Sequence, residues 1–225
     1  MRNKYKVHPL KLRKNQFINY SYLVVDKASG DALIIDPSWE IKKIDMAIEN
    51  LSVNLKYILL THSHFDHVNL VPELLQKYNT EVFMSSNEIE YYGFRCGNLN
   101  AVHNNEQIFL GSTKVVCLLT PGHTSGSTSY LIDNHLFTGD FLFIEGCGIC
   151  SCEGSSTQDM FNSIQRVRNE LAPDTLIYPA HSYGKEPGYS LEYLLKNNVY
   201  FCFDNISDFA DFRLREGQCG IFSFK

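Results

Sequence analysis

Residues 61–67 have the sequence THSHFDH, which places His62, His64, Asp66 and His67 within six residues. Imidazole nitrogens and carboxylate oxygens at this density form a ligand set suited to zinc, iron or manganese. The alternative is a polar loop whose histidines only cap the following helix, and a single histidine would favour that alternative. Three histidines with an aspartate at this spacing favour a metal site.

This segment lies between a predicted strand and a predicted helix. The apolar run at residues 57–60 is typical of a fully buried strand, and the spacing of Leu70, Leu74 and Leu75 indicates a helix. The candidate ligands therefore follow the carboxyl end of a strand, where the active sites of α/β folds gather.

Three further polar residues hold the same position relative to a predicted strand. His123 follows residues 114–119, Asp140 follows residues 135–138, and His181 follows residues 176–178. Each signal is weak alone, because a turn with an exposed histidine, or an aspartate at a strand exit, is more common than a ligand. Four loops at strand ends can converge on one point, so together they predict a shared site.

The remaining patterns predict an α/β protein whose sheets are covered by helices. Strands are also expected at residues 17–25, 32–36, 81–85 and 127–133, and helices at residues 41–51, 86–94 and 161–171. The basic stretch from Lys4 to Lys14 is interrupted by apolar residues, which favours a strand with a solvated face over a basic arm. Because no linker divides the sequence, residues 1–225 are expected to form a single domain.

The composition argues against several classes of function. The formal net charge is −5 with interspersed signs, so no long-range attraction for nucleic acid or anionic lipid is expected. No apolar run reaches the length of a membrane span, and the first residues lack a signal peptide. Seven cysteines, an odd number spread over the chain, fit reduced thiols and a cytoplasmic location.

The ordered motifs H-x-H-x-D-H, P-G-H-T, T-G-D and P-A-H resemble the metallo-β-lactamase superfamily over residues 36–181. The resemblance implies an αββα sandwich, with two mixed sheets flanked by helices, and a hydrolase with two Zn²⁺ ions, or iron or manganese, at the edge of the sheets. Asp66 and Asp140 are then the catalytic carboxylates, and Asp66 orients the attacking hydroxide rather than acting as a free base. One metal would take His62, His64 and His123, the other Asp66, His67 and His181, and Asp140 would bridge them.

The flanking residues are similar to the glyoxalase II branch, which hydrolyses S-acyl glutathione thioesters such as S-lactoylglutathione. The similarity lies in residues 137–143, 146–148 and 181–183. It makes Tyr183, Cys147 and Ile149 the candidate substrate contacts. However, Ile149 replaces the basic residue of that branch, and the stretch after His181 is too short for its helical C-terminal domain. Both departures remove contacts to glutathione. They leave thioester hydrolysis as the expected reaction but argue against glutathione as the carrier of the acyl group.

The whole chain, including residues 191–198, resembles the stand-alone zinc-dependent hydrolases of bacterial polyketide and antibiotic biosynthesis clusters. The implied substrate is an acyl group on the phosphopantetheine arm of an acyl carrier protein. Because such carriers are acidic, we expect a local basic surface. Arg166, Arg168 and Lys185 are candidates for it, although ordinary solvated charges are the simpler interpretation.

Other functions stay open at this point. A persulfide dioxygenase shares the first motif but binds a single iron through residues matching His62, His123 and Asp140. A non-catalytic scaffold usually loses ligands, whereas this sequence retains all seven. Nucleic-acid cleavage is disfavoured by the acidic balance.

The cysteines of the 147–152 segment have no assigned role. A separate zinc or redox site at Cys147, Cys150 and Cys152 lacks a nearby fourth ligand. A loop over the active site is therefore the favoured interpretation.

Overall fold

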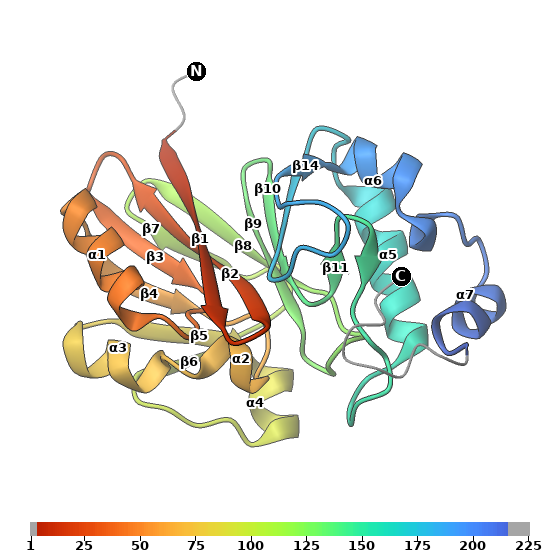
Figure 1. Cartoon of the computed structure of the whole chain (residues 1–225), viewed down its shortest axis with the longest axis horizontal. Coiled ribbons are helices and arrows are strands. Elements are labelled where there is room, and N and C mark those ends of the chain that lie inside the picture. Colours follow the sequence, from red (N-terminus) through yellow and green to blue (C-terminus); the bar gives the residue numbers. More distant parts are fainter. Residues whose placement is uncertain (1–3, 216–225) are drawn as a thin grey trace.

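The computed structural model describes residues 4–215, which contain two six-stranded sheets and a small two-stranded one (Figure 1). Residues 1–3 and 216–225, including Cys219, lie outside the described part. The first sheet has the order β1-β2-β3-β4-β5-β6, with strands β1 Tyr5–Lys14, β2 Phe17–Asp26, β3 Asp31–Ile35, β4 Asn54–Leu59, β5 Glu81–Ser85 and β6 Leu99–Val102. The second has the order β14-β13-β10-β9-β8-β7, with strands β7 Gln107–Leu110, β8 Thr113–Leu119, β9 Thr128–Ile132, β10 His135–Gly139, β13 Leu176–Pro179 and β14 Tyr189–Ser190. Strands β11 Leu142–Phe143 and β12 Gly146–Cys147 form the small sheet.

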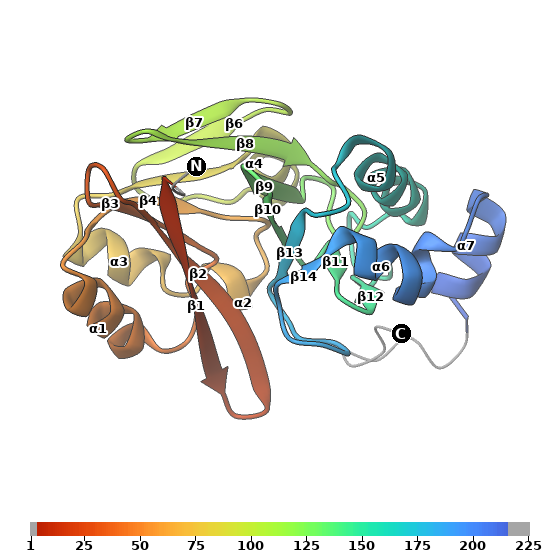
Figure 2. The same ribbon diagram turned by 90° about the horizontal axis from the view of Figure 1, so that it is seen from above.

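Helices cover the outer faces of both large sheets, as Figure 2 shows. The helices are α1 Ile41–Leu51, α2 Phe65–Val68, α3 Val71–Lys77, α4 Ser86–Tyr92, α5 Thr157–Glu170, α6 Leu191–Asn197 and α7 Ile206–Arg213, with a 3-10 helix at Val199–Phe201. Helices α1 and α3 pack on the first sheet through Ile44 and Leu74, and α5 and α6 pack on the second through Ile164 and Leu194. Within residues 4–215, none of the helices combines the length and apolarity that crossing a bilayer would require.

A third apolar cluster lies between the two sheets. Tyr22 and Leu33 of the first sheet share it with Tyr130 and Phe137 of the second, and all four are essentially inaccessible to solvent. The order of layers is therefore helix, sheet, sheet, helix, which confirms the predicted αββα sandwich. The sheets are mixed, because β3 pairs with β2 antiparallel and with β4 parallel.

The basic N-terminal stretch forms a strand, as predicted, and not a free arm. Strand β1 pairs with β2 along its whole length and forms the edge of the first sheet. Its lysines face solvent, which is a common way to protect an edge strand from pairing with another chain. The short strands β6 and β7 were not predicted, because four residues each are too few to show a clear hydrophobic period.

Strand direction explains why the four polar loops meet. Strands β10 and β13 are parallel, and β8 and β10 are both antiparallel to β9. Strands β8, β10 and β13 therefore end at the same edge of the second sheet. The loop after β4 lies against that edge from the first sheet, since the backbone N–H of Thr128 donates to the carbonyl of Thr61 over 2.9 Å.

Candidate metal centre

The first group of ligands consists of three imidazoles from two loops. His62 and His64 follow β4, and His123 follows β8. The Nδ1 atom of His64 lies 3.1 Å from Nε2 of His62 and 3.0 Å from Nε2 of His123. The three ligand nitrogens all lie within 4.8 Å of one another, which is close enough to hold one metal ion. We call these residues the first triad.

A second triad lies beside it. Asp66 and His67 belong to α2, and His181 follows β13. Oδ2 of Asp66 is 3.5 Å from Nε2 of His67 and 3.4 Å from Nε2 of His181. Their ligand atoms also lie within 4.8 Å of one another. The structure thus forms the two groups that the resemblance implied.

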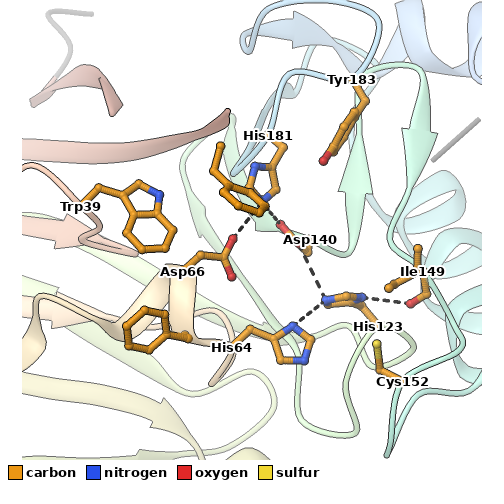
Figure 3. A pocket seen from close by; sticks show the side chains of 11 residues that line it. Trp39, His64, Asp66, His123, Asp140, Ile149, Cys152, His181 and Tyr183 are labelled. Atoms are coloured by element: carbon orange, nitrogen blue, oxygen red, sulfur yellow. Dashed lines mark hydrogen bonds and ion pairs between the residues drawn. The ribbon is translucent and has the colours of Figure 1, made fainter. Parts of the chain in front are cut away.

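Asp140 stands between the triads, as Figure 3 shows. Its Oδ2 atom lies 3.8 Å from Nε2 of His123, and its Oδ1 atom lies 3.4 Å from Nε2 of His181 and 3.5 Å from Nε2 of His67. The preceding residue, Gly139, has φ of 53°, and a Cβ there would lie 2.3 Å from Oγ1 of Thr61. Glycine is therefore required for the turn that directs Asp140 into the site.

Hydrogen bonds at the outer ring nitrogens orient four of the imidazoles, and the partner of Nδ1 of His62 is the Thr61 hydroxyl at 3.1 Å. His123 donates from Nδ1 to the carbonyl of Ile149 over 2.9 Å, and His181 to the carbonyl of Ile18 over 2.8 Å. Nδ1 of His67 pairs with Oδ2 of Asp36 over 2.9 Å. In each ring Nε2 then faces the centre, which is how metal-binding histidines are commonly oriented.

The two triads differ in protonation when no metal is bound. Burial lowers the pKa of His62 well below its usual value and that of His123 to about 4. Burial alone would also lower the pKa of His67 and His181. The carboxylates around them, Asp140 included, instead raise the pKa of His181 to about 10 and that of His67 well above its usual value.

The buried polar atoms of the centre fit a metal ion. Within residues 4–215, Nε2 of His67 and Oδ1 of Asp140 are buried and have no hydrogen-bond partner. Leaving such groups unpaired costs about 1–3 kcal/mol each. Nitrogen and oxygen atoms that face one another at 3.0–3.8 Å around a common centre are the donor set that a divalent metal takes. The residues present therefore support a metal cofactor.

Two buried carboxylates that sequence reasoning missed hold the ligand loops together. Asp36 accepts from the backbone N–H and the hydroxyl of Thr61, at 2.8 and 2.6 Å, besides contacting His67. Glu88 accepts from the backbone and hydroxyl of Ser63 at 2.8 and 2.7 Å, and from the hydroxyl of Thr124 at 2.8 Å. Glu88 thereby ties the loop of His62 and His64 to the loop of His123.

A third buried residue, Asn19 of β2, positions Asp66. Its side-chain amide donates to Oδ2 and to the backbone carbonyl of Asp66, both at 3.0 Å. Its carbonyl accepts from Nε1 of Trp39 over 2.8 Å. Asn19 thus links a metal-ligand candidate to an aromatic residue of the neighbouring wall.

A cavity of about 410 Å³ opens onto the centre. Trp39 lines one wall together with Phe17 and Phe65, whose rings pack against it. Ile149 and Tyr183 lie on the side opposite Trp39 (Figure 3). The walls are mainly apolar, whereas Asp66, Asp140 and three of the histidines supply the polar inner end. Such a cavity suits a substrate with an apolar body and one reactive polar group.

The predicted substrate contacts are placed differently from one another. Ile149 and Tyr183 line the cavity, as does Cys152. The side chain of Cys147 is instead fully buried in the core beneath α5 and α6, so a substrate contact through its thiol is ruled out by burial. Among the described residues, no group of potential ligands includes Cys147, Cys150 or Cys152, and all three are free thiols.

The predicted basic surface on α5 is not a free cation patch. Arg166 pairs with Glu170 over 2.9 Å and also donates to the side chains of Asn104 and Asn105. Arg168 pairs with Asp204 over 3.1 Å. These arginines hold neighbouring segments of the fold together.

The fold and the site define a metal-dependent hydrolase of the metallo-β-lactamase type. Residues 15–181 match the sequence model of the metallo-beta-lactamase superfamily, and the chain belongs to that superfamily. A solved structure titled as a metallo-beta-lactamase from Staphylococcus aureus aligns with a TM-score of 0.85 and 26% identity, over 95% of this chain and 69% of that one.

Relatives with known names indicate which kind of hydrolase the chain is most similar to. The chain is 49% identical to the "Probable polyketide biosynthesis zinc-dependent hydrolase PksB" of Bacillus subtilis, over 98% of both chains. It is 47% identical to the similarly named BaeB of Bacillus velezensis, over the full length of both. A hydroxyacylglutathione hydrolase of Buchnera aphidicola is 36% identical over 80% of this chain and 68% of that one. The glyoxalase II branch is therefore related but more distant.

Proposed function

We propose that the chain is a two-zinc thioesterase that hydrolyses acyl groups carried on a phosphopantetheine arm in polyketide biosynthesis. The observation that carries the proposal is the pair of triads with Asp140 between them at the inner end of an apolar cavity. In the proposed reaction, water adds to the thioester carbonyl carbon and the C–S bond breaks. The products are a carboxylic acid and a free thiol.

The residues of the chain divide the work of this reaction. Metal ions held by the triads would lower the pKa of a water to about 7 and polarise a carbonyl. Asp66 lines the cavity, and Asn19 fixes one of its oxygens, so its carboxylate is placed to orient the attacking water. Burial raises the pKa of Tyr183 far above the usual value, so its hydroxyl stays protonated and can donate to the substrate. A thiolate leaves readily, since its conjugate acid has a pKa near 8.5.

The carrier-bound substrate is supported by the cavity wall and by the relatives. Ile149 is apolar where the glyoxalase II branch places a cation, and the two full-length relatives are named for polyketide biosynthesis. Six described cysteines are free thiols, which supports a cytoplasmic location for the enzyme.

The direct test measures thiol release from acyl thioesters by metal-loaded and metal-free protein. We expect about two zinc ions per chain and hydrolysis of both acyl-N-acetylcysteamine and an acylated carrier protein. Asp66→Ala should lower kcat by on the order of a thousandfold or more, as for other core catalytic groups. His103→Ala is the matched control, because His103 is exposed, lies outside the candidate ligands and hydrogen-bonds the Ser86 hydroxyl. Full activity of metal-free protein would disprove the proposal.

The same samples distinguish the dioxygenase alternative. A single iron held by His62, His123 and Asp140 would leave Asp66, His67 and His181 without a metal, yet the ligand atoms of those three also lie within 4.8 Å of one another. Oxygen uptake with glutathione persulfide is therefore expected to be absent. Uptake by the iron-loaded protein together with no thiol release would favour the dioxygenase.

A further inference from the structure

A lysine lies over the aromatic wall of the cavity. Lys14, the last residue of β1, places its ammonium 4.7 Å from the ring centre of Trp39 and 5.7 Å from that of Phe65. Both rings line the cavity. Cation–π contacts with two rings hold the charge at this rim even though the side chain is exposed.

Around the turn of the β1–β2 hairpin, basic side chains outnumber the carboxylates that pair with them. Lys11 pairs with Glu186 over 2.9 Å, and Lys43 approaches Glu40 at 3.9 Å. By contrast, the side chains of Lys14 and its exposed neighbour Arg13 form no ion pair within residues 4–215. This surplus is notable in a chain whose formal net charge is −5.

Lys14 belongs to the basic N-terminal stretch, which lies outside the metal-binding motifs. The β1–β2 hairpin extends past α2 (Figure 2), and Phe17, the first residue of β2, lines the cavity. The opposite wall offers Ile149 and Tyr183, which carry no positive charge. An anionic group on the outer part of a substrate would therefore meet its counter-charge at the hairpin.

We propose that Lys14 binds an anionic group on the outer, carrier-side part of the substrate while the thioester occupies the metal end of the cavity. The proposal rests on the thioesterase function proposed above and adds the charge of the substrate. Lysine and arginine both pair with phosphate and carboxylate. The anion is thus the phosphate of a phosphopantetheine arm or a carboxylate of a glutathione-like carrier.

Trp39 provides the binding signal, because it is the one tryptophan of the sequence and lies beneath Lys14. S-methyl phosphopantetheine and S-methyl pantetheine differ only in the phosphate and have no free thiol to bind metal. Their titration into metal-loaded protein, followed by Trp39 fluorescence, isolates recognition of the phosphate. S-methylglutathione and its diethyl ester form the corresponding pair for carboxylates.

We expect the charged member of at least one pair to bind about three- to fivefold more tightly, the scale of an exposed ion pair. The ratio should approach one in Lys14→Gln and in high salt, and it should persist in Lys14→Arg. Lys6→Gln is the matched control, because Lys6 is exposed on the same strand but at the end remote from the hairpin turn. The pair that discriminates identifies the anion as phosphate or carboxylate.

The outcomes separate the two proposals. Equal binding of both members in both pairs, or a ratio that Lys14→Gln leaves unchanged, overturns the inference. Charge-dependent binding without hydrolysis of any thioester overturns the thioesterase function and leaves the anion site standing. Hydrolysis without charge discrimination overturns the anion site alone.

Discussion

The inner end of the cavity and its outer rim are held in different ways. At the inner end, each of the rings of His67, His123 and His181 is fixed by a hydrogen bond from another part of the chain. At the rim, Phe65 and Phe17 are 66% and 37% exposed. Trp39 alone of the three rim aromatics is tied inward by a side-chain hydrogen bond, to Asn19.

This difference assigns different tasks to the two ends. A reaction that depends on charge needs ligands fixed before the substrate arrives, because reorienting them during the reaction would raise the barrier. A rim of exposed aromatic rings imposes no such geometry and can accept several acyl groups or carriers. We therefore expect the inner end to fix the chemistry and the rim to select the substrate.

Among the changes that compare the two ends, the largest effect is expected from removing the carboxylates that support the inner end. Asp36→Asn removes the carboxylate behind His67, and an amide cannot accept from all the donors that surround Asp36. Loss of such a support typically lowers metal affinity ten- to a hundredfold. The loss should fall mainly on the second triad, through His67, and less on the first, where Asp36 reaches His62 only through the Thr61 hydroxyl. It is measured as zinc retained per chain during titration with a chelator.

Glu88→Gln provides the reciprocal change. Its carboxylate joins Ser63 to Thr124, so its loss should loosen the first triad and leave the second less affected. Phe17→Ala, a change at the rim, is the control that should keep both metals. Equal loss from both triads in Asp36→Asn and Glu88→Gln would show that the two halves of the site are not separately supported.

The candidate ligands could be predicted from the sequence, whereas the residues that support them could not. The density of histidine and aspartate in residues 62–67 predicts a metal site, and the three remote candidates, His123, Asp140 and His181, each follow the end of a strand. Their assignment to two groups came from the family resemblance. Periodicity alone also indicated most strands and helices, because the buried strands and amphipathic helices of this chain are long enough to show it.

Asp36 and Glu88 show why the rest could not be predicted. Asp36 follows a strand and precedes a proline, so it is typical of a turn residue. Glu88 stands three residues after Ser85, the spacing of a capping box in which glutamate bonds the backbone of its own helix. Ser85 does accept from the backbone of Glu88, but the Glu88 carboxylate reaches two ligand loops instead. Only the tertiary fold distinguishes these roles.

A second prediction concerns the pH dependence of metal binding, which should differ between the two triads. In the metal-free protein, His67 and His181 are protonated at neutral pH, whereas the histidines of the first triad are neutral. Metal must displace the protons of the second triad, so its apparent affinity should rise about tenfold per pH unit for each proton displaced. The first triad should show little dependence until the pH falls toward about 4, the pKa of His123.

Zinc content measured from pH 8 down to pH 5.5 therefore should fall from about two ions to about one. Calorimetry in two buffers of different ionisation enthalpy should show that protons are released only when zinc binds the second triad. The stability of the metal-free protein should depend on pH in the opposite direction to its metal affinity. The pKa of His181 in the folded protein is raised to about 10, so protonated His181 stabilises the fold at low pH. This contribution is lost as the pH rises through that value. Simultaneous loss of both ions on acidification would contradict the assignment.

The smallest effect is expected at the rim. Two variants of Trp39 distinguish its role as an apolar wall from its role as the hydrogen-bond donor to Asn19. Trp39→Ala removes an aromatic wall and the hydrogen bond to Asn19, whereas Trp39→Phe removes the hydrogen bond but keeps a ring. If the wall serves only to bind the acyl chain, Trp39→Ala should raise KM for a long acyl thioester several-fold, as expected for about 1 kcal/mol of lost apolar contact. Trp39→Phe should then stay close to the wild type, with kcat unchanged in both.

The alternative is that Asn19 needs Trp39 in order to hold Asp66. In that case both Trp39 variants should lower kcat, because each leaves the carbonyl of Asn19 without its donor and frees the amide that orients Asp66. Asn19→Ala should reproduce that loss of kcat while keeping the ring and the KM of the wild type. A fall in kcat in Trp39→Phe would therefore mean that the rim and the inner end are coupled through a single buried amide, and that substrate selection and chemistry are not independent in this enzyme.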